Sequence, residues 1–364
     1  MSNALDGLEG VVAAETVLSE VDGEAGRLVI RGFTLDELVG RWTYEEAAHL
    51  LWSGFFDDLP GDLAAPLGQA RAMVFAEVAA LDPALVARAP IEAMRALTAR
   101  LADGDDLATA LRLTAAPAVF TAAVTRAQAG EAPVAPDPDA GHAADILRMT
   151  RGAAASAAEV AALDAYLVTV IDHGLNASTF AARVTASTHA GLASAVLAGI
   201  SALKGPLHGG APGPVIEMLD GVGRPGDARA WLEAALDRGD RLMGFGHRVY
   251  RVRDPRADAL KRAVKALGEG SNSLPGRLAL AEAVETAALA ILRERKPNRS
   301  LQTNVELYTG LMLEVLAFPR EAFTCVFAMG RVAGWIAHAR EQVLTGRLIR
   351  PQSRYVGPAP RQAA

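Results

Sequence analysis

The sequence predicts a mainly α-helical protein with a short β-hairpin near its start. Aromatic residues make up only 5% of the chain, while alanine, the strongest helix former, is abundant. A β pattern is confined to residues 11–33, and beyond it the chain consists of helix-length segments separated by proline, glycine and aspartate. We therefore expect close-packed helices rather than a β-sandwich.

The expected hairpin begins with a strand over residues 16–21. Residues 22–26, Asp-Gly-Glu-Ala-Gly, form its turn, and residues 27–31 form the returning strand. After Gly32 the pattern becomes helical. Thr34 and Thr43 each precede acidic residues of a first helical turn, which is the pattern of an N-cap.

The rest of the chain is expected to form helices joined by short connections. Residues 129–141, with three prolines, predict a mobile loop or linker, and residues 204–213 predict a Gly/Pro-rich turn. The predicted helices cover residues 63–81, 91–102, 107–128, 143–150, 157–173, 177–203, 226–238, 254–267, 276–294, 303–316 and 320–345.

Length, charge and cysteine content limit the classes of function. A chain of 364 residues allows two or three domains at roughly 100–200 residues each. With a net charge of −6, the chain lacks the overall basic character that is typical of nucleic-acid-binding proteins. The single cysteine, Cys325, excludes an intramolecular disulfide framework and a cysteine-rich zinc site. The start of the chain lacks the basic segment and the following apolar segment of a secretory signal peptide, so we expect a cytoplasmic protein.

One uncharged stretch, residues 184–203, is long enough to cross a bilayer. It also contains Thr185, Ser187, Thr188 and His189, together with two glycines. So many polar and small residues favour a buried helix in a large core, and no membrane contact is expected.

Two of the seven histidines stand in glycine-rich turns. His208 lies in Lys-Gly-Pro-Leu-His-Gly-Gly and His247 in Gly-Phe-Gly-His-Arg-Val-Tyr. Glycine permits positive φ and lets a ligand approach the backbone closely. A helix that begins after such a turn would place N–H groups near the imidazole and favour its neutral form. Both histidines are candidate functional residues, and the alternative is that they are ordinary loop histidines.

Three arginines and one glutamate are further candidates. Arg256, Arg331 and Arg350 could bind carboxylates through bidentate hydrogen bonds, although arginines are more often surface charges. Glu306 is flanked by apolar residues that could raise its pKa and make it a general base; a solvated helical glutamate is the alternative. The chain has no His-Glu-x-x-His spacing, so no metal is implied. It has no Walker A loop and no Gly-x-Gly-x-x-Gly after a strand, so these motifs do not support nucleotide binding, and a serine nucleophile elbow is also missing.

In their order, these motifs resemble those of the citrate synthase family nearly end to end. The resemblance rests on these segments: Gly7-Leu-Glu-Gly-Val-Val, Asp22-Gly23, Arg31-Gly32, Asp172-His173, Asn176-Ala-Ser-Thr-Phe-Ala-Ala-Arg183, Lys204-Gly-Pro-Leu-His-Gly-Gly210, Gly244-Phe-Gly-His-Arg-Val-Tyr250, Asp254-Pro-Arg256, Asn304-Val-Glu-Leu-Tyr-Thr-Gly310, Gly334-Trp-Ile-Ala-His338 and Ile349-Arg-Pro351. It implies a two-domain helical homodimer. The large domain would comprise residues 1–211 and 311–364, and a small domain, residues 212–310, would close over the cleft.

The resemblance also implies an acyltransferase that condenses acetyl-CoA with oxaloacetate to give citrate and CoA, with acetyl-CoA as co-substrate and no cofactor. His208 would hydrogen-bond the thioester oxygen, Glu306 would remove a methyl proton, and His247 would polarise the ketone. His173, Arg256 and Arg331 would hold oxaloacetate, and Arg350 would reach into the partner subunit's site. The implied contacts to CoA are Leu242, Met243, Gly244, Phe245, Gly246, Arg251 and Arg354.

Three residues depart from the family pattern. Glu306 stands where Asp is usual, so the base is one methylene longer and could sit about 1 Å away from its usual place. Gly174 stands where Glu is common, and Gln352 where a second Arg often follows. The alternatives are a 2-methylcitrate synthase that uses propionyl-CoA, a non-catalytic paralogue that binds the same ligands, and a helical scaffold without a small-molecule site. The first differs from citrate synthase by one methyl group of substrate, which a pocket discriminates by only about 1–3 kcal/mol.

Overall fold

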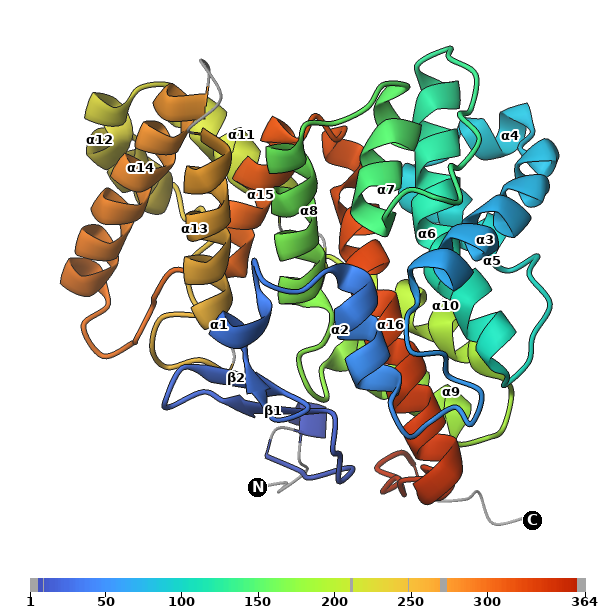
Figure 1. The fold of residues 1–364 in the computed structure, drawn as a ribbon. Helices are drawn as coiled ribbons and strands as arrows, with labels where there is room; N and C mark the ends of the chain where they lie inside the picture. Colours follow the sequence, from blue (N-terminus) through green and yellow to red (C-terminus); the bar gives the residue numbers. More distant parts are fainter. Residues whose placement is uncertain (1–5, 9, 210–211, 248, 269–273, 359–364) are drawn as a thin grey trace.

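The computed structural model describes residues 6–8, 10–209, 212–247, 249–268 and 274–358. Glu9, Gly210 and Arg248 of the motifs, and the proposed domain boundary at Ala211, lie outside the described residues. Within them the protein is mainly helical with one small antiparallel sheet, as predicted (Figure 1).

The sheet contains the predicted hairpin. Strands β1 (Ser19–Asp22) and β2 (Arg27–Ile30) pair antiparallel, with Ser19 opposite Ile30. The Asp22 carboxylate accepts hydrogen bonds from the backbone N–H groups of two turn residues and so fixes the turn. A third strand, β3 (Phe33–Thr34), extends the sheet beyond the predicted hairpin.

Both predicted N-caps are present in the first half of the chain. Thr34 and Thr43 each form a capping box with the glutamate three residues later. The helices of this half are α1 (Leu35–Leu38), α2 (Tyr44–Trp52), α3 (Ala64–Phe75), α4 (Pro83–Val86), α5 (Pro90–Thr98), α6 (Leu107–Gln128), α7 (His142–Arg151), α8 (Ala157–Val170), α9 (Ala177–Ala186) and α10 (Leu192–Leu203).

The prediction of a single helix over residues 177–203 is wrong. The chain leaves the helix after Ala186, and both His189 (φ 58°) and Gly191 (φ 93°) adopt left-handed backbone. The Asp103 carboxylate then accepts hydrogen bonds from the Ala193 and Ser194 N–H groups at the start of α10. Since α10 has only 12 residues, the uncharged stretch is too short to span a bilayer as one helix.

Residues 129–141 form the predicted loop, but the loop is held against the body of the protein rather than serving as a linker. The buried Arg71 guanidinium donates to the carbonyls of Asp137 and Ala140. A Cβ on Gly68 would lie 2.0 Å from the Pro138 carbonyl oxygen, so this helix surface accepts the loop only because it carries glycine.

The second half contributes two groups of helices. Helices α11 to α14 lie together on one side of the molecule, and α15 and α16 return to its centre (Figure 1). Their bounds are α11 (Pro212–Val222), α12 (Ala228–Asp237), α13 (Pro255–Gly268), α14 (Leu274–Arg295), α15 (Val305–Val315) and α16 (Phe323–Thr345). Single 3-10 turns cover Asp6–Leu8, Ala76–Ala80, Pro225–Asp227 and Arg320–Ala322.

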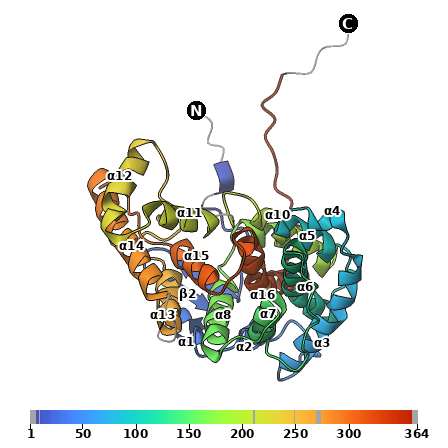
Figure 2. The same ribbon diagram turned by 90° about the horizontal axis from the view of Figure 1, so that it is seen from above.

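The core is organised around α6 and α16. Helix α16 packs against α2, α6, α8, α9 and α10, and α6 packs against α3, α5 and α7. These two helices are apolar and long enough to span a membrane, but nearly all of the apolar stretch of each is buried inside the molecule. That burial is typical of core helices in a large globular protein. Beyond α16, residues 346–358 are mostly exposed, and the tail extends away from the body (Figure 2).

Candidate active site

A cleft of about 850 Å³ brings together candidate residues that are far apart in the sequence. Its walls come from the N-terminal segment, the connection before α9, the turn after α10, the loop before α13, and helices α13, α15 and α16. The catalytic and substrate-binding candidates on its walls are His173, His208, His247, Arg256, Glu306 and Arg331.

His208 is held by the turn that follows α10. Its N–H donates to the Gly205 carbonyl, and the Gly209 N–H donates to the Leu203 carbonyl. A Cβ on Gly209 would lie 2.5 Å from that carbonyl oxygen, so this tight turn requires glycine. The imidazole Nε2 lies 2.8 Å from the Ser178 hydroxyl, which comes from the first turn of α9.

His247 is oriented by the backbone that follows it. Its Nδ1 accepts hydrogen bonds from the N–H groups of Val249 (3.0 Å) and Tyr250 (3.1 Å), so in the neutral ring Nε2 carries the proton. Burial and the nearby Arg256 guanidinium lower the pKa of His247 to about 4. The ring is therefore neutral at physiological pH, with Nε2–H available as a donor.

Arg256 and His247 present two donors to the same place. Arg256 Nη2 lies 3.3 Å from His247 Nε2, and neither group can accept from the other in these protonation states. An oxygen atom placed between them would accept from both. This pair of donors suits a ketone or carboxylate oxygen.

Asp254 connects Arg256 to the helix that carries Glu306. Its carboxylate accepts from Arg256 Nη2 at 2.8 Å and from Nε at 3.1 Å, and both side chains are buried. The same carboxylate accepts from the Val305 N–H at the start of α15. Although the Asp-Pro-Arg motif was recognised in the sequence, this anchoring role of Asp254 was not predicted from it.

Glu306 lies in the first turn of α15 on the wall of the cleft. Asn304 caps this helix by accepting from the Glu306 N–H. Burial raises the pKa of Glu306 to about 7, Arg256 opposes this rise and Asp254 adds to it. A carboxyl group with such a pKa can accept a proton at neutral pH, which is what a general base requires.

Arg331 is buried on α16. Its Nε donates to the Val170 carbonyl at 2.5 Å, and its guanidinium lies 5.0 Å from the centre of the Phe327 ring. Among the described residues, no carboxylate lies within ion-pair distance of it. Burial lowers the pKa of Arg331 to about 10. This cation is consistent with a site that receives an anionic ligand.

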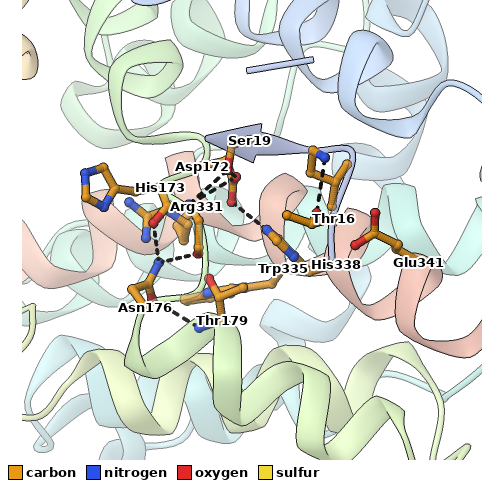
Figure 3. A network of polar contacts seen from close by, with 12 residues as sticks. Thr16, Ser19, Asp172, His173, Asn176, Thr179, Arg331, Trp335, His338 and Glu341 are labelled. Atoms are coloured by element: carbon orange, nitrogen blue, oxygen red, sulfur yellow. Dashed lines mark hydrogen bonds and ion pairs between the residues drawn. The ribbon is translucent and has the colours of Figure 1, made fainter. Parts of the chain in front are cut away.

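His173 lies beside a buried polar network that joins three parts of the chain (Figure 3). Its neighbour Asp172 accepts hydrogen bonds from the Ser19 hydroxyl in β1 and from His338 Nε2 (3.1 Å) in α16. Arg183 donates to His338 Nδ1 (2.9 Å), so the His338 Nε2–H is the donor to Asp172. The network therefore fixes the position of the backbone that carries His173.

Two shifts in pKa follow from this burial. Burial, with Arg256 and Arg331 nearby, lowers the pKa of His173 well below its ordinary value, so the ring is neutral. Burial alone would raise the pKa of Asp172, but His338, Ser19 and Arg331 together lower it below its ordinary value. Asp172 is thus a buried carboxylate that remains ionised.

We predict that Asp172→Ala lowers the free energy of unfolding by about 3–5 kcal/mol, because it leaves the donors of Ser19 and His338 buried without an acceptor. Urea denaturation measures this change. Glu294→Ala, which breaks an exposed ion pair with Arg229, is the matched control and should change stability little. Equal stabilities of the two variants would contradict the prediction.

Residues 242–246, the predicted contacts to CoA, form one wall of the cleft. Gly244 (φ 86°) and Gly246 (φ 85°) adopt left-handed backbone. The Asn304 N–H donates to the Gly244 carbonyl, and the Asn304 side-chain amide donates to the Gly246 carbonyl. The loop is thereby attached to the start of the helix that carries Glu306.

Three other predicted residues lie outside the cleft lining of a single chain. Arg251 is exposed, and its N–H donates to the Gly23 carbonyl of the hairpin turn. Arg350 and Arg354 are exposed on the C-terminal tail. Conversely, the lining includes Val21 and, from the N-terminal motif, Val11 and Val12, none of which was predicted as a site residue.

Comparisons with known proteins agree with the order of the motifs. The family model described as citrate synthase, C-terminal domain, matches residues 7–352. Citrate synthase of Haloferax volcanii is 39% identical over 373 residues, covering 96% of this chain and 95% of that protein. The 2-methylcitrate synthase of Mycobacterium tuberculosis is 35% identical over 367 residues, covering 96% of this chain and 90% of that protein.

A solved structure shares the fold over its whole length. It is the ternary complex of carboxymethyl coenzyme A and oxaloacetate with citrate synthase from Thermoplasma acidophilum, with a TM-score of 0.85 and 26% identity over 100% of this chain and 99% of that one. The family match spans the cleft residues from His173 to Arg331. By sequence and by fold, the chain belongs to the citrate synthase family of condensing enzymes.

Proposed function

We propose that this protein condenses acetyl-CoA with oxaloacetate and hydrolyses the product to citrate and CoA. The observation that carries the proposal is that a single cleft holds a carboxyl group with a pKa near 7, three imidazoles and two buried guanidiniums. The similar Thermoplasma protein binds oxaloacetate and a CoA analogue, which supports the same pair of ligands here.

In the proposed reaction, Glu306 removes a proton from the acetyl methyl group while His208 donates a hydrogen bond to the thioester oxygen. One such donor to a developing oxyanion is worth roughly 3–4 kcal/mol. The enolate carbon attacks the oxaloacetate ketone, whose oxygen accepts a hydrogen bond from His247 Nε2–H. This oxygen gains a proton to become the hydroxyl of citryl-CoA, which balances the proton that Glu306 took from the methyl group. Water then cleaves the thioester, so acetyl-CoA, oxaloacetate and water give citrate and CoA. His173, Arg256 and Arg331 would hold the carboxylates of oxaloacetate.

We further propose that residues 212–310 act as a small domain that closes over the cleft. Helices α11 to α14 form one side of the molecule, and the loop bearing His247 leads directly into α13. Closure would bring this side toward α16, exclude water and complete the CoA contacts of residues 242–246.

Measuring thiol release tests both whether the protein is an enzyme and which acyl-CoA it prefers. Acetyl-CoA and propionyl-CoA are each supplied with and without oxaloacetate. Oxaloacetate-dependent release that is faster with acetyl-CoA supports a citrate synthase, for which we propose a role in the tricarboxylic acid cycle of the cytoplasm. Faster release with propionyl-CoA indicates a 2-methylcitrate synthase. No release from folded protein indicates a non-catalytic paralogue and overturns the proposal.

The pH dependence of turnover provides a separate prediction. Because burial raises the pKa of Glu306 to about 7, the deprotonated base is scarce at pH 6 and predominates above pH 8. We expect kcat at saturating substrates to rise with pH through about 7 and then to level off. A kcat that is constant between pH 6 and 8 would show that the base has an ordinary pKa or that another step limits turnover.

We also propose a homodimer in which Arg350 completes the site of the partner subunit. Large apolar side chains are exposed on both terminal segments, including Val12, Tyr355 and Val356, and a partner would cover them. The tail that carries Arg350 extends away from its own body (Figure 2). The small residues of α10 would also permit close helix packing between subunits.

Complementation tests this shared site. Arg350→Ala should leave the dimer intact and weaken oxaloacetate binding, and His208→Ala should abolish most activity. Co-expression of the two variants should restore part of the activity, because a mixed dimer rebuilds one intact site. A monomer by light scattering, or no restored activity in purified mixed dimers, would contradict the shared site.

A further inference from the structure

The hydroxyl of Ser178 links His208 to a buried tryptophan. Trp335 Nε1 donates to Ser178 Oγ at 3.1 Å, and His208 Nε2 lies 2.8 Å from the same oxygen. The third neighbour is Asn176, whose Oδ1 lies 2.8 Å from Ser178 Oγ. Figure 3 shows the Trp335 ring beside the start of α9, where Asn176 and Thr179 are labelled.

The single hydroxyl proton of Ser178 can go to only one of two acceptors. If it goes to Asn176, then His208 must carry its own proton on Nε2 and donate to Ser178. If it goes to His208 Nε2, then the neutral ring carries its proton on Nδ1. Asn176 Oδ1 already accepts from the N–H groups of Ser178 and Thr179 (3.1 Å each). It therefore remains hydrogen-bonded when the Ser178 hydroxyl proton goes to His208.

The Trp335 N–H biases this choice. The indole N–H can only donate, so it always occupies a lone pair of Ser178 Oγ. An oxygen that accepts one hydrogen bond becomes a poorer acceptor for a second one and a stronger donor of its own proton. The Ser178 proton is therefore directed toward His208 Nε2, and the imidazole proton is held on Nδ1.

The placement of Trp335 is specified by the packing around it. Its side chain is fully buried in α16. A Cβ on Gly199 of α10 would lie 2.8 Å from the indole ring, so the glycine leaves the space that the ring fills. The indole therefore has little freedom to turn its N–H away from Ser178.

We propose that Trp335 is a positioning residue that, through Ser178, sets the tautomer of His208. This inference rests on the proposed function for its catalytic consequence, because only the Nδ1–H tautomer can keep its Nε2 bond to Ser178 and still donate to the thioester oxygen. Trp335 itself touches no reacting atom in this scheme.

The test compares Trp335→Phe with Trp52→Phe. Both tryptophans are fully buried, but the Trp52 indole donates to the Ala333 carbonyl, and Trp52 lines no part of the cleft. We expect Trp335→Phe to lower kcat on the order of 10-fold relative to Trp52→Phe, as for outer partners that orient a functional histidine. The KM for oxaloacetate should not change. In a Ser178→Ala background, the Trp335 substitution should have no further effect on kcat.

The tautomer is measured without catalysis, by ¹⁵N NMR of the ligand-free protein, with the His208 signals assigned by their loss in His208→Gln. The parent should show Nδ1–H, and Trp335→Phe should increase the Nε2–H form. An Nε2–H ring in the parent, or equal kcat and tautomer in the two Phe variants, would overturn the inference. Absence of condensation in the parent would defeat the proposed function alone, because the tautomer measurement stands without it.

Discussion

Replacing Glu306 by Gln is expected to lower kcat by roughly 10²–10⁴-fold, the usual range for a general acid or base. The substitution keeps the shape of the side chain and removes only its ability to take a proton. The KM for oxaloacetate should change little, because Arg256 and Arg331 remain in place. Steady-state kinetics with acetyl-CoA and oxaloacetate would measure both quantities.

Loss of folding can be separated from loss of the base. The pKa of Glu306 is raised in the folded protein, so the stability it contributes is present below its ordinary pKa of 4.5 and lost as the pH rises through about 7. Glu306→Gln should therefore be at least as stable as the parent above pH 7. A stable Gln variant that retained parental kcat would show that another group takes the proton.

Glu306→Asp tests whether the site has adapted to the longer side chain. The family usually has Asp at this position, and a displacement of about 1 Å can cost on the order of 10²-fold in rate. If the cleft is built around glutamate, the shorter side chain loses activity. If the cleft retains the geometry for aspartate, the Asp variant equals or exceeds the parent. The two outcomes distinguish a rebuilt site from a merely tolerated substitution.

The sequence predicted the helical class, the hairpin and most helix bounds because these depend on local signals. The N-caps at Thr34 and Thr43 are read from four consecutive residues, and both are confirmed. The break between α9 and α10 was missed because its cause is distant: Asp103 caps α10 from another part of the chain. A local pattern of apolar residues cannot reveal such a distant contact.

In the candidate site, too, local patterns were predicted from the sequence and distant contacts were not. Glycine turns and motif order indicated His208 and His247, which the fold brings into one cleft. The roles of Asp254 and Ser178 depend on hydrogen bonds to residues that only the fold places beside them. The roles of Arg350 in a partner subunit's site and of Arg354 as a contact to CoA stay predictions.

The two buried arginines of the cleft should respond in opposite ways to removal of their charge. Arg256 has a carboxylate partner, Asp254, whereas no described carboxylate pairs with Arg331. Arg256→Met would leave Asp254 buried without its cation, which costs about 3–5 kcal/mol of the free energy of unfolding. Arg331→Met removes a buried charge whose loss of hydration outweighs its attraction to the nearby Asp172 carboxylate, so it should raise the melting temperature.

Both substitutions should nevertheless weaken oxaloacetate binding. Losing one partner of a desolvated charge pair costs about 2–5 kcal/mol, which corresponds to a rise of roughly 30- to 4,000-fold in KM, while the fall in kcat should be smaller. Kinetics and thermal unfolding of the two variants, each with and without oxaloacetate, would measure both effects. Oxaloacetate should raise the melting temperature of the parent far more than that of either variant.

The sign of the stability change in Arg331→Met decides between two explanations of the buried cation. If Arg331 is part of the packing of the core, its removal destabilises the protein whether or not ligand is present. If Arg331 is held ready for a ligand carboxylate, the free protein bears the cost of its burial and the ligand offsets that cost on binding. A more stable variant that no longer binds oxaloacetate is the result expected of a site that has given up stability for ligand binding. A destabilised variant with parental KM would show that Arg331 serves the fold and that oxaloacetate is held elsewhere.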